Sequence, residues 1–381
     1  MKHKPVTFEV ADVFRRFGDG YLAEHGAAMP PSHRCAIGDL QACRTPALGG
    51  HQYRCEHCGE EVHAWHSCKN RSCPKCHTTQ TREWLEKRHA QMLPISYFHV
   101  TVTTPQPLRA IFRSNQRDCY GLLQQASGEA IMELARDERY CGGTVGILEV
   151  LHTWTQMLHY HPHVHCLVTG GGISADGLTW LPVVRPEFLF PVRALSRLVR
   201  GKFLTLLKHK RPDLSVPEAA WTQEWVVHCA HWKAGETGVL DYLARYVFRV
   251  ALANCRILAL DEQTVTFRYT DRESGQRLHC QVTGHEFIRR FLQHVLPKGF
   301  HKVRYFGLWH SSKREVLDRV RLALLLESRK AAPVDLLTPV AAPDPEEDDK
   351  KSVYDGTSCP ACRQGRLRHV QEVPPTMTRG P

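Results

Sequence analysis

The chain has 381 residues, of which 42% are hydrophobic and 23% charged, and these proportions are typical of folded globular proteins. At roughly 150 residues per domain, this length excludes a small peptide and predicts two or three domains. The 50 Lys and Arg outnumber the 39 Asp and Glu, and the resulting formal charge of +11 favours a polyanionic partner such as nucleic acid. We find neither the ~18 consecutive apolar residues of a membrane span nor a secretory signal, so we expect a cytoplasmic protein without membrane contact.

Residues 1–34 are predicted to form a helical lead-in. Apolar residues recur at helical spacing from Val10 to His25, and Pro30-Pro31 breaks the helix. Residues 35–92 follow as a segment that is rich in Cys, His and Gly and has no long apolar period. We expect metal to stabilise this segment, because it cannot build a large apolar core. A helix from Gln80 to Met92 is predicted at its end.

Two Cys-x2-Cys pairs predict a zinc ribbon in this segment. Cys55 and Cys58 are separated from Cys73 and Cys76 by fourteen residues, a spacing at which two tight turns bring four thiolates to the corners of one tetrahedron. Gly59 follows the first pair and supplies the dihedral freedom that such a turn needs. The zinc ion would be structural, since four thiolates leave no open coordination position.

The remaining cysteines leave a second zinc site open. Cys43 and Cys68 are its leading members, although buried thiols without a metal are an equal alternative. Near the C terminus, Cys359 and Cys362 repeat the two-residue spacing. This last pair forms half of a second ribbon, completes an earlier site, or has no metal role.

Basic and aromatic residues accompany the zinc ligands. Lys69, Arg71 and Lys75 lie within or beside the second pair, and Trp65 and Trp84 provide flat apolar faces nearby. This mixture suits a DNA backbone and stacked bases, so we expect a DNA-binding surface here. A solvated basic face with buried tryptophans is the alternative.

The largest domain is predicted over residues 95–310. A helix over 311–330 follows it, and then a linker and C-terminal tail over 331–381 that carries the last Cys-x2-Cys knuckle. The mixture of strands and helices predicts an α+β fold with a central, mostly antiparallel sheet covered by helices. The predicted strands are Tyr97–Thr103, Thr144–Trp154, His163–Thr169 and a hairpin over Arg256–Val282, and the predicted helices are Asn115–Arg136, Val192–Lys210, Gly238–Leu252 and His285–Val295.

Two histidines on one strand predict a second type of metal site. Alternation places His163 and His165 on one face, about 7 Å apart at their Cα atoms, while Val164 and Cys166 face the core. A nitrogen and oxygen site with open positions suits Mg²⁺ or Mn²⁺ when a phosphate supplies further ligands. Two surface histidines on an edge strand are the alternative.

The third ligand of this site is predicted from strand pairing. If residues whose numbers sum to about 315 or 317 lie opposite each other in a hairpin, His152 joins the ligand face. A one-residue slip would bring Glu149 there instead. His161, from the turn, and His99, from the strand before, are further candidates.

A tyrosine pair lies on the predicted helix Gly238–Leu252. Tyr242 and Tyr246 are one turn apart and share one edge of the helix. Packing is the favoured role for such a pair taken alone. Beside a metal site, however, a tyrosine oxygen can attack a phosphodiester. Arg245 and Arg249, one turn from the tyrosines, could neutralise phosphate charge, or they could be solvated helix arginines.

The ribbon, the histidine strand and the tyrosine helix, in this order, resemble the rolling-circle transposases of the two-tyrosine HUH class, insertion-sequence family ninety-one. HUH denotes histidine, hydrophobe, histidine, which matches His163-Val164-His165, and the tyrosine pair matches Tyr242 and Tyr246. The similarity extends over most of the chain. It includes Cys43–His51, Ser67–Cys76, His152–Gln156, Gly170–Gly172 and His294–Phe300.

The resemblance implies an HUH-type nuclease domain behind a small zinc-binding domain, with a catalytic divalent metal ion. It implies nicking and joining of single-stranded DNA from the ends of the protein's own mobile element, through 5′-phosphotyrosine intermediates on two tyrosines that take turns. It also implies a bacterial-type cytoplasmic protein that joins the nucleoid when bound. A replication initiator or relaxase with the same chemistry is one alternative, and a non-catalytic zinc-ribbon DNA-binding regulator is another. No oligomeric state is predicted.

Overall fold

The computed structural model describes residues 8–76, 78–232, 247, 250–271, 273–331 and 354–377. Its helices are α1 (Val10–His25), α2 (Pro31–Ala42), α3 (Thr78–His89), α4 (Arg109–Ser114), α5 (Gln116–Arg136), α6 (Val192–Lys210), α7 (Glu218–Thr222), α9 (Gly284–Leu292) and α10 (Arg314–Ala331). Its strands are β1 (Gly50–Cys55), β2 (Glu61–Trp65), β3 (Tyr97–Thr103), β4 (Thr144–Trp154), β5 (Tyr160–Ile173), β6 (Trp180–Pro182), β7 (Val226–Trp232), β8 (Ile257–Leu260), β9 (Thr264–Thr270), β10 (Arg277–Thr283), β11 (Val303–Gly307) and β12 (Leu367–Val373). Helices and antiparallel sheets together confirm the mixed α+β class.

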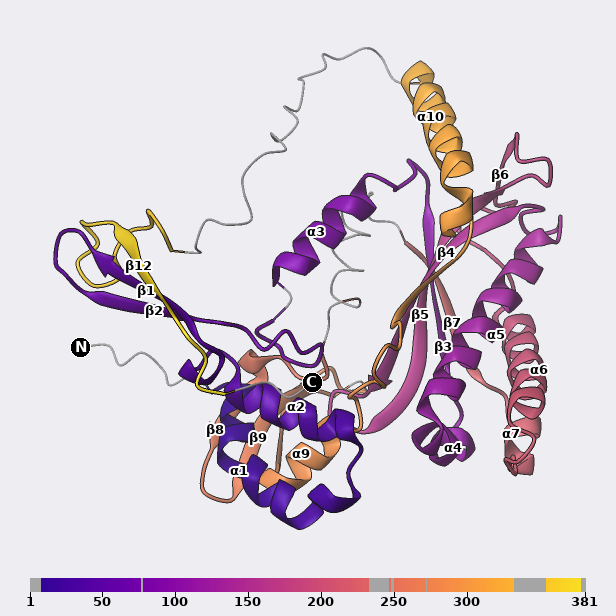
Figure 1. Cartoon of the computed structure of the whole chain (residues 1–381). Helices are drawn as coiled ribbons and strands as arrows, with labels where there is room; N and C mark the ends of the chain where they lie inside the picture. The colour runs from indigo at the N-terminus through magenta and orange to yellow at the C-terminus, as the bar shows by residue number, and fades with distance from the viewer. Residues whose placement is uncertain are drawn as a thin grey trace.

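The central sheet has the strand order β11-β4-β5-β3-β7, and β6 pairs with β5 beside this path. Its pairs are antiparallel. Period-two alternation sends Val100 and Val164 to one face, where they join the largest apolar core together with Leu123 of α5 and Phe203 of α6. Figure 1 shows α5 and α6 side by side on this face and α3 on the opposite side of the sheet. The opposite face therefore remains for the histidines of β5.

A second core joins the N-terminal helices to residues 251–295. Helices α1 and α2 pack with α9 and with the sheet β10-β9-β8, and Phe14 of α1 meets Phe291 of α9 edge to face at 5.2 Å between ring centroids. Four cysteines of the segment 43–76 are buried in this core. The first cysteine cluster is therefore built into a packed unit and does not stand alone.

A third sheet, in the order β12-β1-β2, projects from the rest of the molecule, and its indigo and yellow strands lie side by side in Figure 1. The pairing runs from Gly50 opposite Val373 to Cys55 opposite Leu367. Residues more than three hundred positions apart in the sequence are thus neighbours in one sheet.

Several elements begin and end at the predicted residues, among them α1, β3, β4 and α6. The predicted end of the histidine strand before Gly170 is wrong, because β5 continues to Ile173 and pairs there with β6. Helix α2 and strands β7, β11 and β12 were not predicted. The predicted helix Gly238–Leu252 lies almost entirely outside the described residues.

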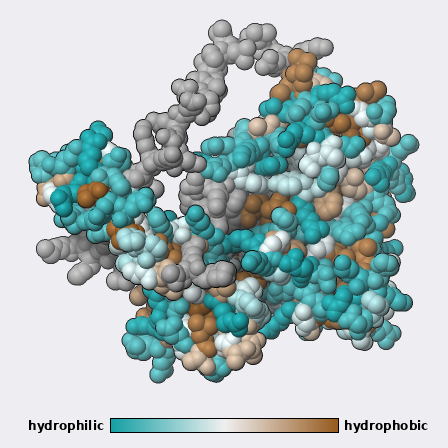
Figure 2. All heavy atoms as spheres, viewed as in Figure 1, coloured by the Kyte–Doolittle hydropathy of each residue, from teal (hydrophilic) through white to brown (hydrophobic). Residues whose placement is uncertain are grey.

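Among the described residues, every helix is too short or too polar to cross a bilayer. Figure 2 shows the viewed face as mostly hydrophilic, with apolar side chains in small separate patches. Singly exposed apolar side chains of this kind are normal on a protein surface.

Candidate metal centres and the histidine face

The β4–β5 hairpin brings the predicted histidines together. His152 lies directly opposite His163, in the register whose residue numbers sum to 315. The one-residue slip does not occur, because Glu149 pairs with Cys166 and is fully buried on the face that α5 covers. Burial raises the pKa of Glu149 well above its ordinary value. Glu149 therefore belongs to the core and not to the ligand face.

Three imidazoles converge on the open face of the sheet. One ring nitrogen each of His152, His163 and His165 lies within 4.8 Å of the others. His152 and His163 are only 3% and 6% exposed, whereas His165 is half-buried. The cluster is thus recessed and reachable from solvent on the His165 side.

Neighbouring groups orient two of these rings. His163 donates from Nδ1 to the carbonyl oxygen of His161 at 2.7 Å, which leaves Nε2 to face the cluster. His165 Nδ1 lies 3.0 Å from Nε2 of His99, and the two rings stack. Burial, and then the charge of His228, lower the pKa of His99 to about 4. His99 therefore stands behind His165 as a neutral hydrogen-bonding partner and not inside the cluster.

Pro162 is accommodated in a central strand by an irregularity in the pairing of β5 with β4, where β5 carries one extra residue. Pairing between β4 and β5 skips from His152 opposite His163 to Trp154 opposite Tyr160. The missing N–H of Pro162 falls within this bulge, so no ladder hydrogen bond is lost. Its carbonyl oxygen accepts hydrogen bonds from the N–H and the hydroxyl of Thr104 at 3.2 and 2.8 Å.

The predicted nucleophiles Tyr242 and Tyr246, with Arg245 and Arg249, lie outside the described residues. Val247, which directly follows Tyr246, is among the described residues. It is buried in a cluster with Val150 and Leu167 on the histidine face of the sheet. Lys302 Nζ donates to its carbonyl oxygen at 3.2 Å.

The first cysteine cluster consists of Cys43, Cys68, Cys73 and Cys76, all buried. Its sulfur–sulfur separations include 3.6 Å for Cys43 and Cys73 and 3.6 Å for Cys68 and Cys76. A tetrahedron with Zn–S bonds of about 2.3 Å has edges of about 3.8 Å, whereas a disulfide holds its sulfurs at about 2.05 Å. The donors and their spacing therefore fit a zinc ion.

The second cluster consists of Cys55, Cys58, Cys359 and Cys362. Cys55 lies 3.7 Å from Cys362 and Cys58 lies 3.8 Å from Cys359, measured between sulfurs. The predicted single ribbon is therefore wrong in its pairing, because its two Cys-x2-Cys pairs belong to different clusters. Cys43 and Cys68, the suggested members of a second site, instead complete the site of Cys73 and Cys76.

The backbone around both clusters is shaped for metal-binding turns. A left-handed conformation follows four of the eight cysteines directly, at Arg44, Gly59, Lys69 and Arg363, with φ between 54° and 74°. This conformation costs a non-glycine residue about 1–2 kcal/mol, which is offset if the turn serves a bound ion. Backbone N–H groups also point at sulfur, as that of Gly365 does at 3.4 Å from Cys362, whose pKa they lower to about 6.

The predicted DNA-binding residues of this segment differ in their contacts. Lys69 is exposed beside the first cluster. Arg71 donates to the carbonyl oxygen of Phe300 at 2.6 Å and so ties the cluster to the segment that precedes β11. Lys75 forms a 2.7 Å ion pair with Glu9. Of these three residues, Lys69 is therefore the one that exposes its charge to solvent without such a hydrogen bond or ion pair.

Comparison with known proteins gives two matching families. Residues 13–104 match the family described as "Transposase zinc-binding domain", and residues 146–316 match the family described as "Putative transposase". The chain is 39% identical over 389 residues to "Putative transposase y4qJ" of Sinorhizobium fredii, with 95% of each chain covered. It is 26% identical over 319 residues to the transposase for insertion sequence element IS801 of Pseudomonas savastanoi pv. phaseolicola, with 79% of this chain and 76% of that one covered. No solved structure matches the chain significantly.

Proposed function

Because this chain belongs to the IS91 family of transposases, which cleave DNA, we propose that it nicks and rejoins single-stranded DNA through 5′-phosphotyrosine intermediates. The transfer would move an insertion sequence by a rolling-circle-like mechanism. The observation that carries the proposal is the histidine cluster, in which three imidazoles from one hairpin surround a space that is open on the His165 side.

The donor set fits a divalent cation with open coordination positions. His152, His163 and His165 would hold Mg²⁺ or Mn²⁺ through ring nitrogens, with His163 using Nε2. The bound ion would polarise the scissile phosphate and favour loss of the phenolic proton, whose ordinary pKa is about 10. His99 would orient the ring of His165 through the 3.0 Å contact between their ring nitrogens.

Tyr242 and Tyr246 are the proposed nucleophiles. The phenolic oxygen attacks the phosphorus and loses its proton, the bond from phosphorus to the 3′ oxygen breaks, and the leaving strand takes up a proton as its 3′-hydroxyl. A 3′-hydroxyl later reverses the linkage, so rejoining needs no external energy source. Burial of Val247 on the histidine face supports this assignment, because Val247 directly follows Tyr246 in the chain. Arg245 and Arg249 would neutralise phosphate charge.

Each cysteine cluster is proposed to hold one structural zinc ion. The ion at Cys43, Cys68, Cys73 and Cys76 would stabilise the unit formed by α1, α2 and α9. The ion in the second cluster would attach the C-terminal residues 354–377 to β1. Both ions are structural, since four thiolates leave no position for water or substrate.

Formation of a covalent adduct tests the proposal. The protein is mixed with Mn²⁺ and single-stranded DNA from the ends of its element, and adducts are separated on a denaturing gel. We expect an adduct from the wild type and from each single Tyr→Phe variant at Tyr242 and Tyr246, and none from the double variant or from His163→Ala. An adduct that survives His163→Ala or a chelator contradicts the metal site. Binding without any adduct would identify a regulator and not a nuclease.

A further inference from the structure

We propose that a positively charged trough guides the single strand to the histidine cluster. The trough runs between the N-terminal helices and the central sheet, and it recognises the sugar-phosphate backbone. This inference rests on the proposed function, because it places the strand that flanks the cleaved phosphate.

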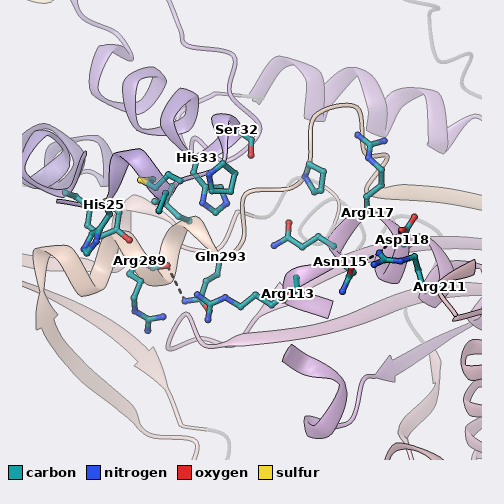
Figure 3. A pocket seen from close by; sticks show the side chains of 18 residues that line it. His25, Ser32, His33, Arg113, Asn115, Arg117, Asp118, Arg211, Arg289 and Gln293 are labelled. Carbon is teal, nitrogen blue, oxygen red and sulfur yellow. Dashed lines mark hydrogen bonds and ion pairs between the residues drawn. The ribbon is translucent and has the colours of Figure 1, made fainter. Parts of the chain in front are cut away.

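Two neighbouring cavities form the trough. The first, of about 790 Å³, lies between the start of α2, the junction of α4 and α5, and α9 (Figure 3). The second, of about 770 Å³, lies between the first cysteine cluster, the end of β4 and residues 291–302. Both cavities are lined by Ser32 and by Pro297, so they adjoin at these two residues.

The charge of the trough is strongly positive. Among its described lining residues, the first cavity has four arginines against Asp118, and the second has four basic residues against Asp39. The surplus of six positive charges compares with +11 for the entire chain. Such a concentration attracts a polyanion and holds it near the surface.

These charges are not equally available. Arg211 is paired with Asp213 at 2.7 Å, and Arg289 is paired with Glu286 at 2.5 Å. Arg113 is exposed and forms no ion pair with a described residue, and its side chain extends across the cavity toward Gln293 in Figure 3. Burial lowers the pKa of the neighbouring His33, and the charge of Arg113 lowers it further. Arg113 is therefore an uncompensated charge in the first cavity.

The second cavity lies next to the histidine cluster at Trp154. Trp154 lines it, and the Trp154 ring stacks on His152 with 4.5 Å between centroids and 21° between planes. Lys302, also in the lining, lies with Nζ 5.1 Å from the Trp154 ring centroid. A DNA backbone that leaves the histidine cluster would meet Lys302, Lys298 and Lys69 in the second cavity and Arg113 in the first.

The test is the salt dependence of binding to a labelled oligothymidylate of about 24 nucleotides, which exceeds the ~4–16 nucleotides of a single compact site. Affinity is measured by fluorescence anisotropy at salt concentrations from about 50 to 200 mM. Each phosphate contact contributes about 0.7 to the slope of log K against log salt for a single strand. Removing one contact should therefore lower that slope by about 0.7.

We expect this reduction for Arg113→Ala and Lys298→Ala, and twice the reduction for the double variant. Arg319→Ala is the matched control, because Arg319 is exposed on α10 and lines neither cavity. Unchanged slopes for both trough variants, or an equal reduction for Arg319→Ala, would overturn the inference. Unchanged thermal unfolding of each variant excludes misfolding as the cause.

The adduct assay separates this inference from the proposed function. Adduct formation by the wild type together with unchanged trough slopes would contradict the trough alone. Reduced slopes together with no adduct under any condition would contradict the nuclease and leave the trough as a DNA-binding site.

Discussion

Removal of the second cysteine cluster should detach the C-terminal strand without unfolding the protein. The perturbation is Cys359→Ser with Cys362→Ser, which removes two of four sulfurs from one cluster and none from the other. Zinc content should fall from two ions per chain to one. Residues 354–377 should then lose their attachment to β1, while the central sheet and the histidine cluster remain as they are.

The expected loss of local stability follows from the other interactions that hold residues 354–377 in place. Ordering the 7 residues of β12 costs about 7–14 kcal/mol in backbone entropy, at about 1–2 kcal/mol per residue. Its one deeply buried apolar side chain, that of Leu367, contributes about 1.5–3 kcal/mol. Each ladder hydrogen bond adds only about 1 kcal/mol net. A structural zinc ion, worth about 10–16 kcal/mol in small zinc domains, is therefore the dominant stabilising contribution.

Hydrogen exchange with mass spectrometry measures the effect directly. We expect protection of residues 367–373 to fall by a factor of about a thousand or more, which corresponds to at least about 4 kcal/mol of local stability. Exchange in β4 and β5 should not change. If the double variant kept two zinc ions, or if β12 stayed protected with one, the assignment of the second cluster would be refuted.

Two further predictions concern the central sheet. His99→Ala should weaken Mn²⁺ binding about 10–100-fold while leaving the fold intact, because His99 contacts the second ring nitrogen of His165. Calorimetric titration measures this affinity. An unchanged affinity would show that the contact does not position His165. Glu149→Gln should change the pH dependence of unfolding, because the pKa of Glu149 is raised in the folded protein and the wild type therefore loses stability as pH rises above the unfolded value of about 4.3. The free energy of unfolding of the variant minus that of the wild type should increase by up to about 1.4 kcal/mol per pH unit between pH 5 and the folded pKa. If this difference in free energy did not depend on pH, the Glu149 carboxyl would not be buried in its neutral form.

The parts of the fold that could be predicted are those with strong local periodicity. Strand β3 alternates cleanly, and helix α6 carries an apolar stripe, so their bounds follow from sequence. The position of His152 on the ligand face was also predictable, because a short turn leaves few registers, and the two considered, with sums of 315 and 317, set His152 opposite His163 or His165. Strand β11 gave no such signal, since all five of its residues are half-buried and no polar face contrasts with an apolar one.

The zinc pairing could not be predicted for a different reason. A Cys-x2-Cys spacing determines the shape of one turn, but the three such pairs and the single thiols Cys43 and Cys68 can combine in several ways. The partner of Cys55 and Cys58 is set by the pairing of β1 with β12, a contact across more than three hundred residues. Gly365 lies at this contact, where a larger residue would not fit, because a Cβ there would lie 2.5 Å from the sulfur of Cys55. Helix α2 was missed because its Cys and His residues resembled the metal-binding segment that follows.

The central claim is that a tyrosine of the segment before Val247 becomes joined to a DNA 5′ end under the control of the histidine cluster. Mass spectrometry of the protease-digested adduct, formed with Mn²⁺ on an end-derived oligonucleotide, tests it most directly. The account predicts a nucleotide phosphate on Tyr242 or Tyr246, found in the wild type and missing in His163→Ala. A phosphate attached to any other residue, or an adduct of equal yield in His163→Ala, would contradict it.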